Sequence, residues 1–155
     1  MQSIVSQIHR ILIKSKKTIS IAESCTGGLT SSLLTRITGS SLYFTLGIVA
    51  YDNKIKENIL NIPGRIIARK GAVSKDVAER MAKAARKLAN ADFGIGVTGI
   101  AGPSGATPGK PVGTVFIAID SKDNKICRKF IFTGNRITIR KKAALKALEL
   151  LKRLT

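Results

Sequence analysis

The feature that most constrains the fold is a short alternating apolar run that leads, through two glycines, into a helical segment. Residues 18–22 are typical of a strand, and residues 29–37 carry apolar side chains at helical spacing. Between them, Glu23, Ser24 and Cys25 place a carboxylate, a hydroxyl and a thiol at the junction. Helix starts present unpaired N–H groups and the positive end of the dipole. The turn is therefore a candidate for binding an anion or stabilising an oxyanion.

Strand-like and helix-like segments continue to alternate along the rest of the chain. The spacing predicts helices over 1–16, 53–61, 75–90 and 137–154, strands over 42–50, 92–98, 115–119 and 126–132, and a connector over 65–73. The strand over 42–50 is apolar enough to be buried. Asp123 and Asn124 suit a hairpin turn between the last two strands. The order predicts one layered α/β domain, residues 1–155, with a sheet that is parallel at first and antiparallel at the hairpin.

The chain is strongly basic, with a net charge of +18 from 27 Lys and Arg against nine Asp and Glu. Such a balance is typical of proteins that bind nucleic acid or another anionic ligand. The cations are scattered, however, apart from short runs at 14–17 and 140–142, and aromatic residues make up only 5% of the chain. No pattern of stacking aromatics among basic residues is present. We favour a compositional origin for the charge, and an anionic small substrate is compatible with either origin.

Several classes of protein are disfavoured by what the chain lacks. No apolar run approaches the roughly 20 residues that span a bilayer, and the first residues do not have the pattern of a signal peptide. Cys25 and Cys127 form neither a disulfide framework nor a metal-binding spacing, so we expect a protein of the reduced cytoplasm. His9 is the only histidine and lies among polar positions of the first helix. A Ser-His-Asp or Cys-His pair and a histidine-based metal site are therefore not expected.

Lys56 is the best candidate for a general base. At 100° per residue, Ile55, Ile59, Leu60 and Ile62 form one apolar arc, and Lys56 falls inside it. Burial and the nearby helix start would both lower the pKa of such a lysine and make it a usable base at neutral pH. The alternative is a lysine that reaches the surface past apolar neighbours. Periodicity alone does not decide between the two.

A second glycine-rich loop, residues 99–105, follows the strand that ends at Thr98. Ligands collect at the carboxyl ends of strands in open α/β sheets, so this loop is either part of a site or a flexible connection. Arg136 and Arg140 lie at the start of the last helix, where the dipole disfavours cations. An anionic ligand could compensate there, although solvated arginines are the simpler interpretation.

Six ordered motifs resemble the CinA C-terminal domain family. They are Ala22-Glu23-Ser24-Cys25-Thr26-Gly27-Gly28, Gly39-Ser40-Ser41, Tyr51-Asp52-Asn53 with Lys56, Gly71-Ala72-Val73-Ser74, Thr98-Gly99-Ile100-Ala101-Gly102-Pro103 and Lys110-Pro111-Val112-Gly113-Thr114. The resemblance runs from about residue 4 to the end of the chain. It implies a three-layer α/β/α sandwich with a mixed, mostly parallel sheet, and a homodimer. It also implies a nicotinamide-nucleotide amidase that hydrolyses the carboxamide of nicotinamide mononucleotide without a metal or cofactor.

The resemblance assigns roles to individual residues. Ser24 would be the nucleophile and Lys56 its base. The residues expected to bind substrate are Ser41, Tyr51, Arg136, Thr98, Gly99, Ala101, Gly102, Gly27 and Gly28. The chain departs from the family pattern at Asn135, where an acid is common, and in the loop 104–109, which lacks the usual acids. Many members of that family carry a molybdopterin-binding-like domain before these motifs, and because this sequence shows none, we expect the stand-alone form.

These residues permit one reaction scheme for amide hydrolysis. Neutral Lys56 would take the Ser24 proton as the hydroxyl attacks the carboxamide, and would then protonate the departing ammonia. N–H groups of residues 25–28 could hold the oxyanion, while Arg136, Ser41 or the loop 99–102 could hold the phosphate. Cys25 is the rival nucleophile, but it has no histidine partner. Two other functions stay open, a nucleic-acid-binding or regulatory module and a relative that binds the nucleotide without cleaving it.

Overall fold

Five strands form a single sheet in the computed structural model, which describes residues 3–155. The sheet order is β2-β1-β3-β4-β5. The strands are β1 (Ile19–Glu23), β2 (Phe44–Val49), β3 (Phe93–Gly99), β4 (Thr114–Ser121) and β5 (Lys125–Ile131). β1 pairs in parallel with both β2 and β3, whereas β4 is antiparallel to β3 and to β5. Four strands thus run in one direction and only β4 in the other, which confirms the predicted mixed sheet and its terminal hairpin.

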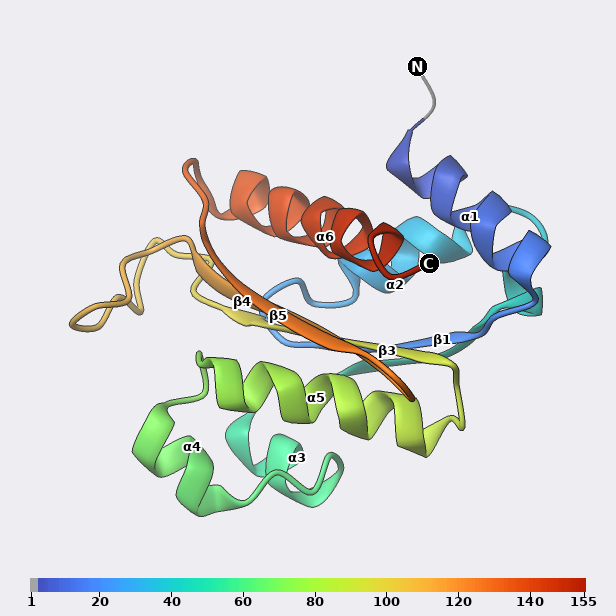
Figure 1. Ribbon diagram of the computed structural model, residues 1–155. Helices are drawn as coiled ribbons and strands as arrows, with labels where there is room; N and C mark the ends of the chain where they lie inside the picture. Colours follow the sequence, from blue (N-terminus) through green and yellow to red (C-terminus); the bar gives the residue numbers. More distant parts are fainter. Residues whose placement is uncertain (1–2) are drawn as a thin grey trace.

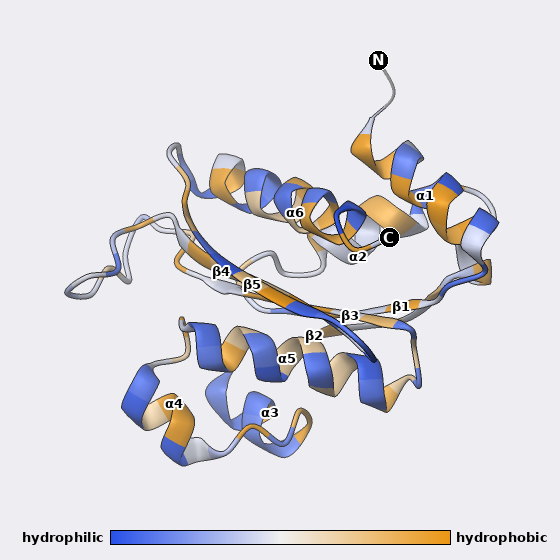
Figure 2. Ribbon diagram, viewed as in Figure 1, coloured by the Kyte–Doolittle hydropathy of each residue, from blue (hydrophilic) through white to orange (hydrophobic). Residues whose placement is uncertain are grey.

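Helices cover both faces of this sheet and make three layers (Figure 1). α1 (Ile4–Ser15), α2 (Leu29–Thr35) and α6 (Arg136–Lys152) lie on one face, and α3 (Asn53–Asn58), α4 (Gly64–Lys70) and α5 (Lys75–Leu88) lie on the other. A short 3-10 turn, η1 (Ser40–Leu42), precedes β2. The first helix was predicted from residue 1, and residues 1–2 lie outside the described part. The buried residues of α1, α5 and α6 are mostly apolar and belong to the cores on the two faces of the sheet, whereas α3 is largely hydrophilic (Figure 2).

The central strands are buried because helices cover them on both sides. All five residues of β1 are buried, as are the first six of β3. One core lies under α1 and α6, and includes Ile8 and Leu148. A smaller core lies under α3, α4 and α5. Parallel strands with two covered faces give the continuous apolar runs from which the strands were predicted.

α5 lies unusually close to β3, and two glycines make this approach possible. A Cβ atom added at Gly94 would lie 2.0 Å from the carbonyl oxygen of Ala82, and one at Gly96 would lie 2.2 Å from that of Ala78. Any side chain at these positions would push the helix away from the sheet. The close contact fixes the end of β3, where the second glycine-rich loop begins.

The prediction of a buried strand over 42–50 was wrong in one respect. β2 is an edge strand, and its residues alternate between half-buried and exposed. Its apolar composition favoured burial because periodicity does not distinguish a covered strand from an uncovered edge. The exposed side chains at its two ends include Leu42 and Val49.

Two helix predictions on the other face also need correction. The connector predicted over 65–73 contains α4, which the glycine and proline at its start had concealed. The helix predicted over 53–61 ends at Asn58. Ile55 and Ile59, predicted to lie on the apolar arc, are exposed at 39% and 44%, while Leu60 and Ile62 are buried. Leu88, at the end of α5, is exposed as well, although the helical spacing of the predicted helix over 75–90 places it on the inward face.

Candidate functional site

The turn after β1 is held at the centre of the sheet's carboxyl edge. The amide of Ser24 donates to the carbonyl of Val97 on β3 at 2.9 Å, and the amide of Ala50 donates to the carbonyl of Glu23 at 2.8 Å. The Ser24 side chain is 9% exposed, and its hydroxyl makes no hydrogen bond within residues 3–155. A hydroxyl fixed by its backbone and free of partners is available to a substrate.

Glu23, which precedes Ser24, uses its carboxylate to cap α2. Its side chain is fully buried and accepts hydrogen bonds from the amides of Thr30 and Ser31 at 3.0 and 2.9 Å, and from the Ser31 hydroxyl at 2.7 Å. The predicted helix start is therefore occupied by the chain's own anion and does not offer these amides to a ligand. The amides of Cys25, Thr26 and Gly28 donate to no carbonyl of the described residues, so they remain candidates for an oxyanion site.

This arrangement predicts that Glu23 is structural. The Glu23→Ala variant should lose about 1–3 kcal/mol in free energy of unfolding, because one buried and one partly buried amide lose their acceptor. Urea unfolding followed by circular dichroism measures the change. Glu149→Ala removes a half-exposed carboxylate of α6 and should shift the midpoint very little. Equal midpoints for wild type and Glu23→Ala would contradict the capping role.

Lys56 is buried, with a side chain only 1% exposed. It lies in α3, whose first turn is capped by the Asp52 side chain, and its Nζ donates to the carbonyl of Tyr51 at 2.9 Å. Burial lowers the pKa of Lys56 below its ordinary value of 10.5, while the negative charge of Asp52 opposes this shift. Of the two interpretations left open by the periodicity, the structure supports the buried amine. The pKa shift makes the neutral form more accessible near physiological pH.

A short chain of backbone contacts connects Lys56 to the Ser24 turn. The carbonyl of Glu23, which precedes Ser24, accepts a hydrogen bond from the amide of Ala50. Tyr51 follows Ala50, and its carbonyl accepts a hydrogen bond from the Lys56 amine. The adjacent carboxyl ends of β1 and β2 therefore position both Ser24 and Lys56. The fold brings the serine turn and the buried lysine to one corner of the sheet.

Cys25, the rival nucleophile, is 5% exposed and belongs to the core beneath α6. Burial raises the pKa of the Cys25 thiol to about 12. The thiolate is the reactive form of cysteine, so this thiol is not activated at neutral pH.

An open cleft of about 220 Å³ lies beside this corner. Its walls come from the Ser24 turn, the end of β2, the second glycine-rich loop and the start of α6, and the lining residues are Cys25, Tyr51, Gly99, Ile100, Ala101, Gly102, Ser104, Gly105 and Arg136. In Figure 1 the segment after β3 extends beyond the sheet on the same side. The glycine-rich loop thus lines a cleft, which agrees with the interpretation that it is part of a site rather than a flexible connection.

Arg136, at the start of α6, forms hydrogen bonds to the glycine-rich loop and to the end of β2. Its Nη1 donates to the carbonyl of Gly102 and its Nη2 to the hydroxyl of Tyr51, both at 2.9 Å. It is an exposed guanidinium at the first position of α6, where the helix dipole disfavours a cation. Its remaining donors can pair with an anion that enters the cleft.

The other residues predicted to bind substrate are placed differently. Thr98 is buried, and its hydroxyl donates to the carbonyl of Ala72 at 2.8 Å, so it fixes the loop before α5. Gly27 and Gly28 lie behind the turn, close to the side chains of Arg140 and Val49. These three support the cleft but do not line it.

Ser41 lies far from the cleft within the chain. It sits in η1, just before Phe44, and Phe44 pairs with Ile19 at the amino end of β1, whereas Ser24 follows the carboxyl end. The length of β2 separates them by about 20 Å, at roughly 3.3 Å per residue. A role for Ser41 in substrate binding stays a prediction.

Arg140 was not assigned to the site by its sequence position. Its Nη2 donates to the carbonyl of Thr26 at 2.8 Å. Its Nε and the Thr26 hydroxyl are both buried and have no hydrogen-bond partner among residues 3–155. The contact joins α6 to the Ser24 turn across 114 residues of chain. Because it depends on tertiary packing, no local signal could have identified it.

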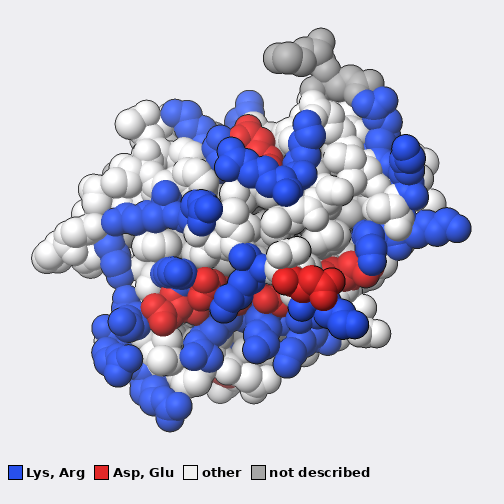
Figure 3. Space-filling view, in the orientation of Figure 1, with Lys and Arg blue, Asp and Glu red and all other residues white. Residues whose placement is uncertain are grey.

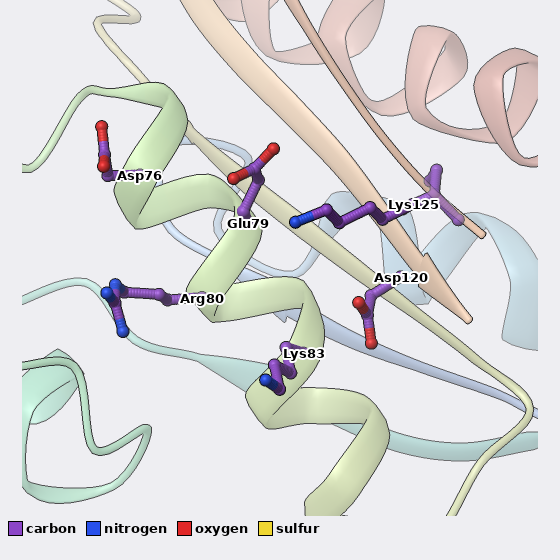
Figure 4. Close-up of a pocket in the computed structure, with 7 residues that line it drawn as sticks. Asp76, Glu79, Arg80, Lys83, Asp120 and Lys125 are labelled. Carbon is purple, nitrogen blue, oxygen red and sulfur yellow. The ribbon is translucent and has the colours of Figure 1, made fainter. Parts of the chain in front are cut away.

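A separate hollow of about 250 Å³ lies between α5 and the end of the hairpin (Figure 4). It is lined by side chains of both signs, and Lys125 of β5 reaches toward α5 beside Glu79. Asp120 already pairs with Arg86 at 2.6 Å.

Over the same face, acids form a band with Lys and Arg on both sides (Figure 3). Charges on this face are interspersed, as the scattered cations of the sequence indicated. Within residues 3–155, no group of His, Cys, Asp and Glu could hold a metal ion, and no helix could cross a bilayer.

Comparisons with known proteins agree in sequence and in structure. Residues 1–155 match the model of the CinA C-terminal domain family. A CinA-like protein of Geobacter sulfurreducens is 43% identical over 151 residues, which cover 97% of this chain and 37% of that relative. A CinA superfamily protein from Escherichia coli has a TM-score of 0.94 at 33% identity, with 98% of this chain and 88% of that one covered. The protein CihA from Agrobacterium tumefaciens has a TM-score of 0.92 at 35% identity, with 99% and 97% covered. The chain spans about a third of the length of the curated relatives it matches.

Proposed function

The chain belongs to the CinA C-terminal domain family, and from that premise we propose that it is an amidohydrolase. Its proposed reaction converts nicotinamide mononucleotide and water into nicotinate mononucleotide and ammonia. The observation that carries the proposal is the burial of the Lys56 amine, with a lowered pKa, at the corner that also holds the partner-free hydroxyl of Ser24. Amide hydrolysis by serine needs such a neutral base.

In the proposed mechanism, Lys56 and Ser24 act as one unit. Neutral Lys56 accepts the Ser24 proton while the hydroxyl oxygen attacks the carboxamide carbon. The C–N bond then breaks as lysinium returns the proton to the leaving nitrogen, which departs as ammonia. Water hydrolyses the resulting ester and restores the Ser24 hydroxyl. The amides of Cys25 and Thr26, which donate to no carbonyl, are suited to hold the oxyanion.

The cleft supplies the contacts proposed for the rest of the nucleotide. Gly99, Ala101 and Gly102 expose backbone close to the cleft and let a flat ring approach. Arg136 is positioned to bind the phosphate with the donors that do not contact Gly102 and Tyr51. A strongly basic chain also favours the approach of an anionic substrate. The scheme uses the chain's own residues and calls for no cofactor.

The proposal includes a homodimer that works in the cytoplasm. The free cysteines Cys25 and Cys127 are compatible with a reducing compartment.

The direct test is incubation of the protein with nicotinamide mononucleotide. Ammonia and nicotinate mononucleotide should form in equal amounts, measured by a coupled ammonia assay and by chromatography. Release of free nicotinamide, or no product, would contradict an amidase. DNA binding titrated with salt tests the competing module, which requires micromolar or tighter affinity that falls steeply with salt. Binding of the nucleotide without ammonia would identify the non-cleaving relative.

A further inference from the structure

Arg140 is a partly buried cation whose charge is not balanced by any carboxylate contact. It makes no ion pair with another of residues 3–155. The first turn of α6 contains no acid, and the positive end of the helix dipole lies nearby. Charged side chains that leave the surface are usually paired, because desolvation of an unpaired charge is costly. Departures from this rule are concentrated at functional sites.

The guanidinium of Arg140 holds the backbone of the turn that follows β1. Its Nη2 donates to the carbonyl of Thr26 at 2.8 Å, and the same carbonyl accepts the amide of Leu29 at 3.2 Å. Gly27 allows this close approach, because a Cβ atom there would lie 3.0 Å from Nη2. α6 packs against α2 on one face of the sheet (Figure 1). Arg140 therefore fixes the segment that joins the nucleophile turn to α2.

The peptide group between Thr26 and Gly27 is held from two sides. Its carbonyl accepts the hydrogen bond from Arg140, and its N–H, the Gly27 amide, donates to the carbonyl of Ser24 at 3.0 Å. The C=O and N–H of a trans peptide point in opposite directions, and hydrogen bonds linked in this way strengthen one another. The bond from Gly27 to Ser24 closes a turn with Cys25 and Thr26 at its centre. The amides of these two central residues are the ones proposed for the oxyanion.

We propose that Arg140 is a positioning residue of the amidase, which fixes the oxyanion turn through the Thr26 carbonyl and adds positive charge beside the Cys25 and Thr26 amides. Negative charge develops at this point when the carboxamide is attacked. The charge of Arg140 acts on this turn: burial raises the pKa of the Cys25 thiol to about 12, and Arg140 partly opposes that shift. The inference rests on the proposed function for the oxyanion, whereas the hold on the turn does not depend on it.

Steady-state kinetics of three variants test the role in the reaction. Arg140→Met removes the charge and the donor, and its kcat for ammonia release from nicotinamide mononucleotide should fall about 10²-fold, as when an oxyanion donor is lost. Its KM should change less than about threefold, because the contact acts in the transition state. Arg140→Lys keeps a cation and should regain at least about tenfold in kcat. Lys141→Met, at an exposed position of the same helix, should match the wild type.

Three kinetic results would overturn the proposal. They are a wild-type kcat in Arg140→Met, a raised KM with unchanged kcat, which would make Arg140 a direct substrate contact, and equal rates for Arg140→Met and Arg140→Lys. Arg140→Gln is a second neutral variant that can still donate to the Thr26 carbonyl. If Arg140→Met does not fold, Arg140→Gln replaces it, and a kcat equal to that of the wild type contradicts the role of the charge.

Hydrogen exchange followed by NMR tests the hold on the turn without using the reaction. The Gly27 amide should exchange at least about tenfold faster in Arg140→Met than in the wild type, because its peptide group is no longer held. The amides of β4 should exchange at the wild-type rate, which shows that the variant stays folded. Equal exchange at Gly27 overturns the positioning role. If the wild type releases no ammonia, the amidase is refuted, while faster exchange at Gly27 still supports the hold of Arg140 on the turn.

Discussion

The Ser24→Ala variant should lose ammonia release from nicotinamide mononucleotide by a factor of roughly 10³ or more, since loss of a nucleophile removes the covalent route. The fold should be unaffected, because the Ser24 side chain makes no hydrogen bond within the described residues and the backbone bond to Val97 does not involve it. Initial rates at saturating and at low substrate concentration, together with the midpoint of thermal unfolding, measure both effects.

Cys25→Ser is the matched control, because it changes the adjacent side chain on the same turn. It should keep activity within a few-fold, since burial holds the pKa of the Cys25 thiol at about 12 and the thiol does not ionise at neutral pH. Loss of activity in Cys25→Ser with retention in Ser24→Ala would transfer the nucleophile to the cysteine.

Lys56→Met should lower kcat/KM by about 10²–10⁴, the usual contribution of a positioned general base. Methionine has a similar length and is apolar, so it fits a site in which the lysine is 1% exposed. The same variant should be more stable than the wild type at neutral pH, because the buried ammonium is removed. Lys56→Met should therefore lose activity while gaining stability. If Lys56 were only structural, its replacement would lower stability instead.

The pH dependence follows from the lowered pKa of Lys56. Between that lowered value and the ordinary 10.5, the unfolded chain holds a proton that the folded chain has released. Wild-type stability gains from Lys56 as pH rises through this window, so the advantage of Lys56→Met should be largest at neutral pH and shrink toward pH 10.5. Over the lower end of the window, wild-type kcat/KM should rise as the amine becomes neutral.

Lys54→Met is the control for the lysine experiments, because it removes an exposed lysine from the same helix. It should leave the rate, the stability and the pH profile of the wild type nearly unchanged. If Lys54→Met and Lys56→Met behave alike, the effect belongs to net charge and not to a base in the corner.

Much of the fold could be predicted from the sequence because its elements have strong local signals. β1, β3 and the hairpin are continuous apolar runs, and α5 has a serine cap followed by an acid in its first turn. α4 was missed because Pro63 and Gly64 are also typical of loops. β2 was placed but not recognised as an edge, since strand order is fixed by packing between segments distant in sequence.

The candidate site was predictable where chemistry and helix geometry coincide. Spacing indicated that Lys56 lies among apolar positions but did not decide whether its amine is buried, and the structure shows that it is. The capping role of Glu23 and the contact of Arg140 with Thr26 could not be found, because each depends on how the turn packs against a helix. The position of Ser41 at the opposite end of β2 likewise depends on the parallel pairing of β1 and β2.

A double-mutant cycle of Ser24→Ala and Lys56→Met, read as kcat/KM for ammonia release, tests the central claim most directly. If the two residues act as one catalytic unit, the double variant should be no slower than Ser24→Ala alone, because the base has no function without its nucleophile. If the two losses multiply, the residues act independently and the proposed dyad is contradicted.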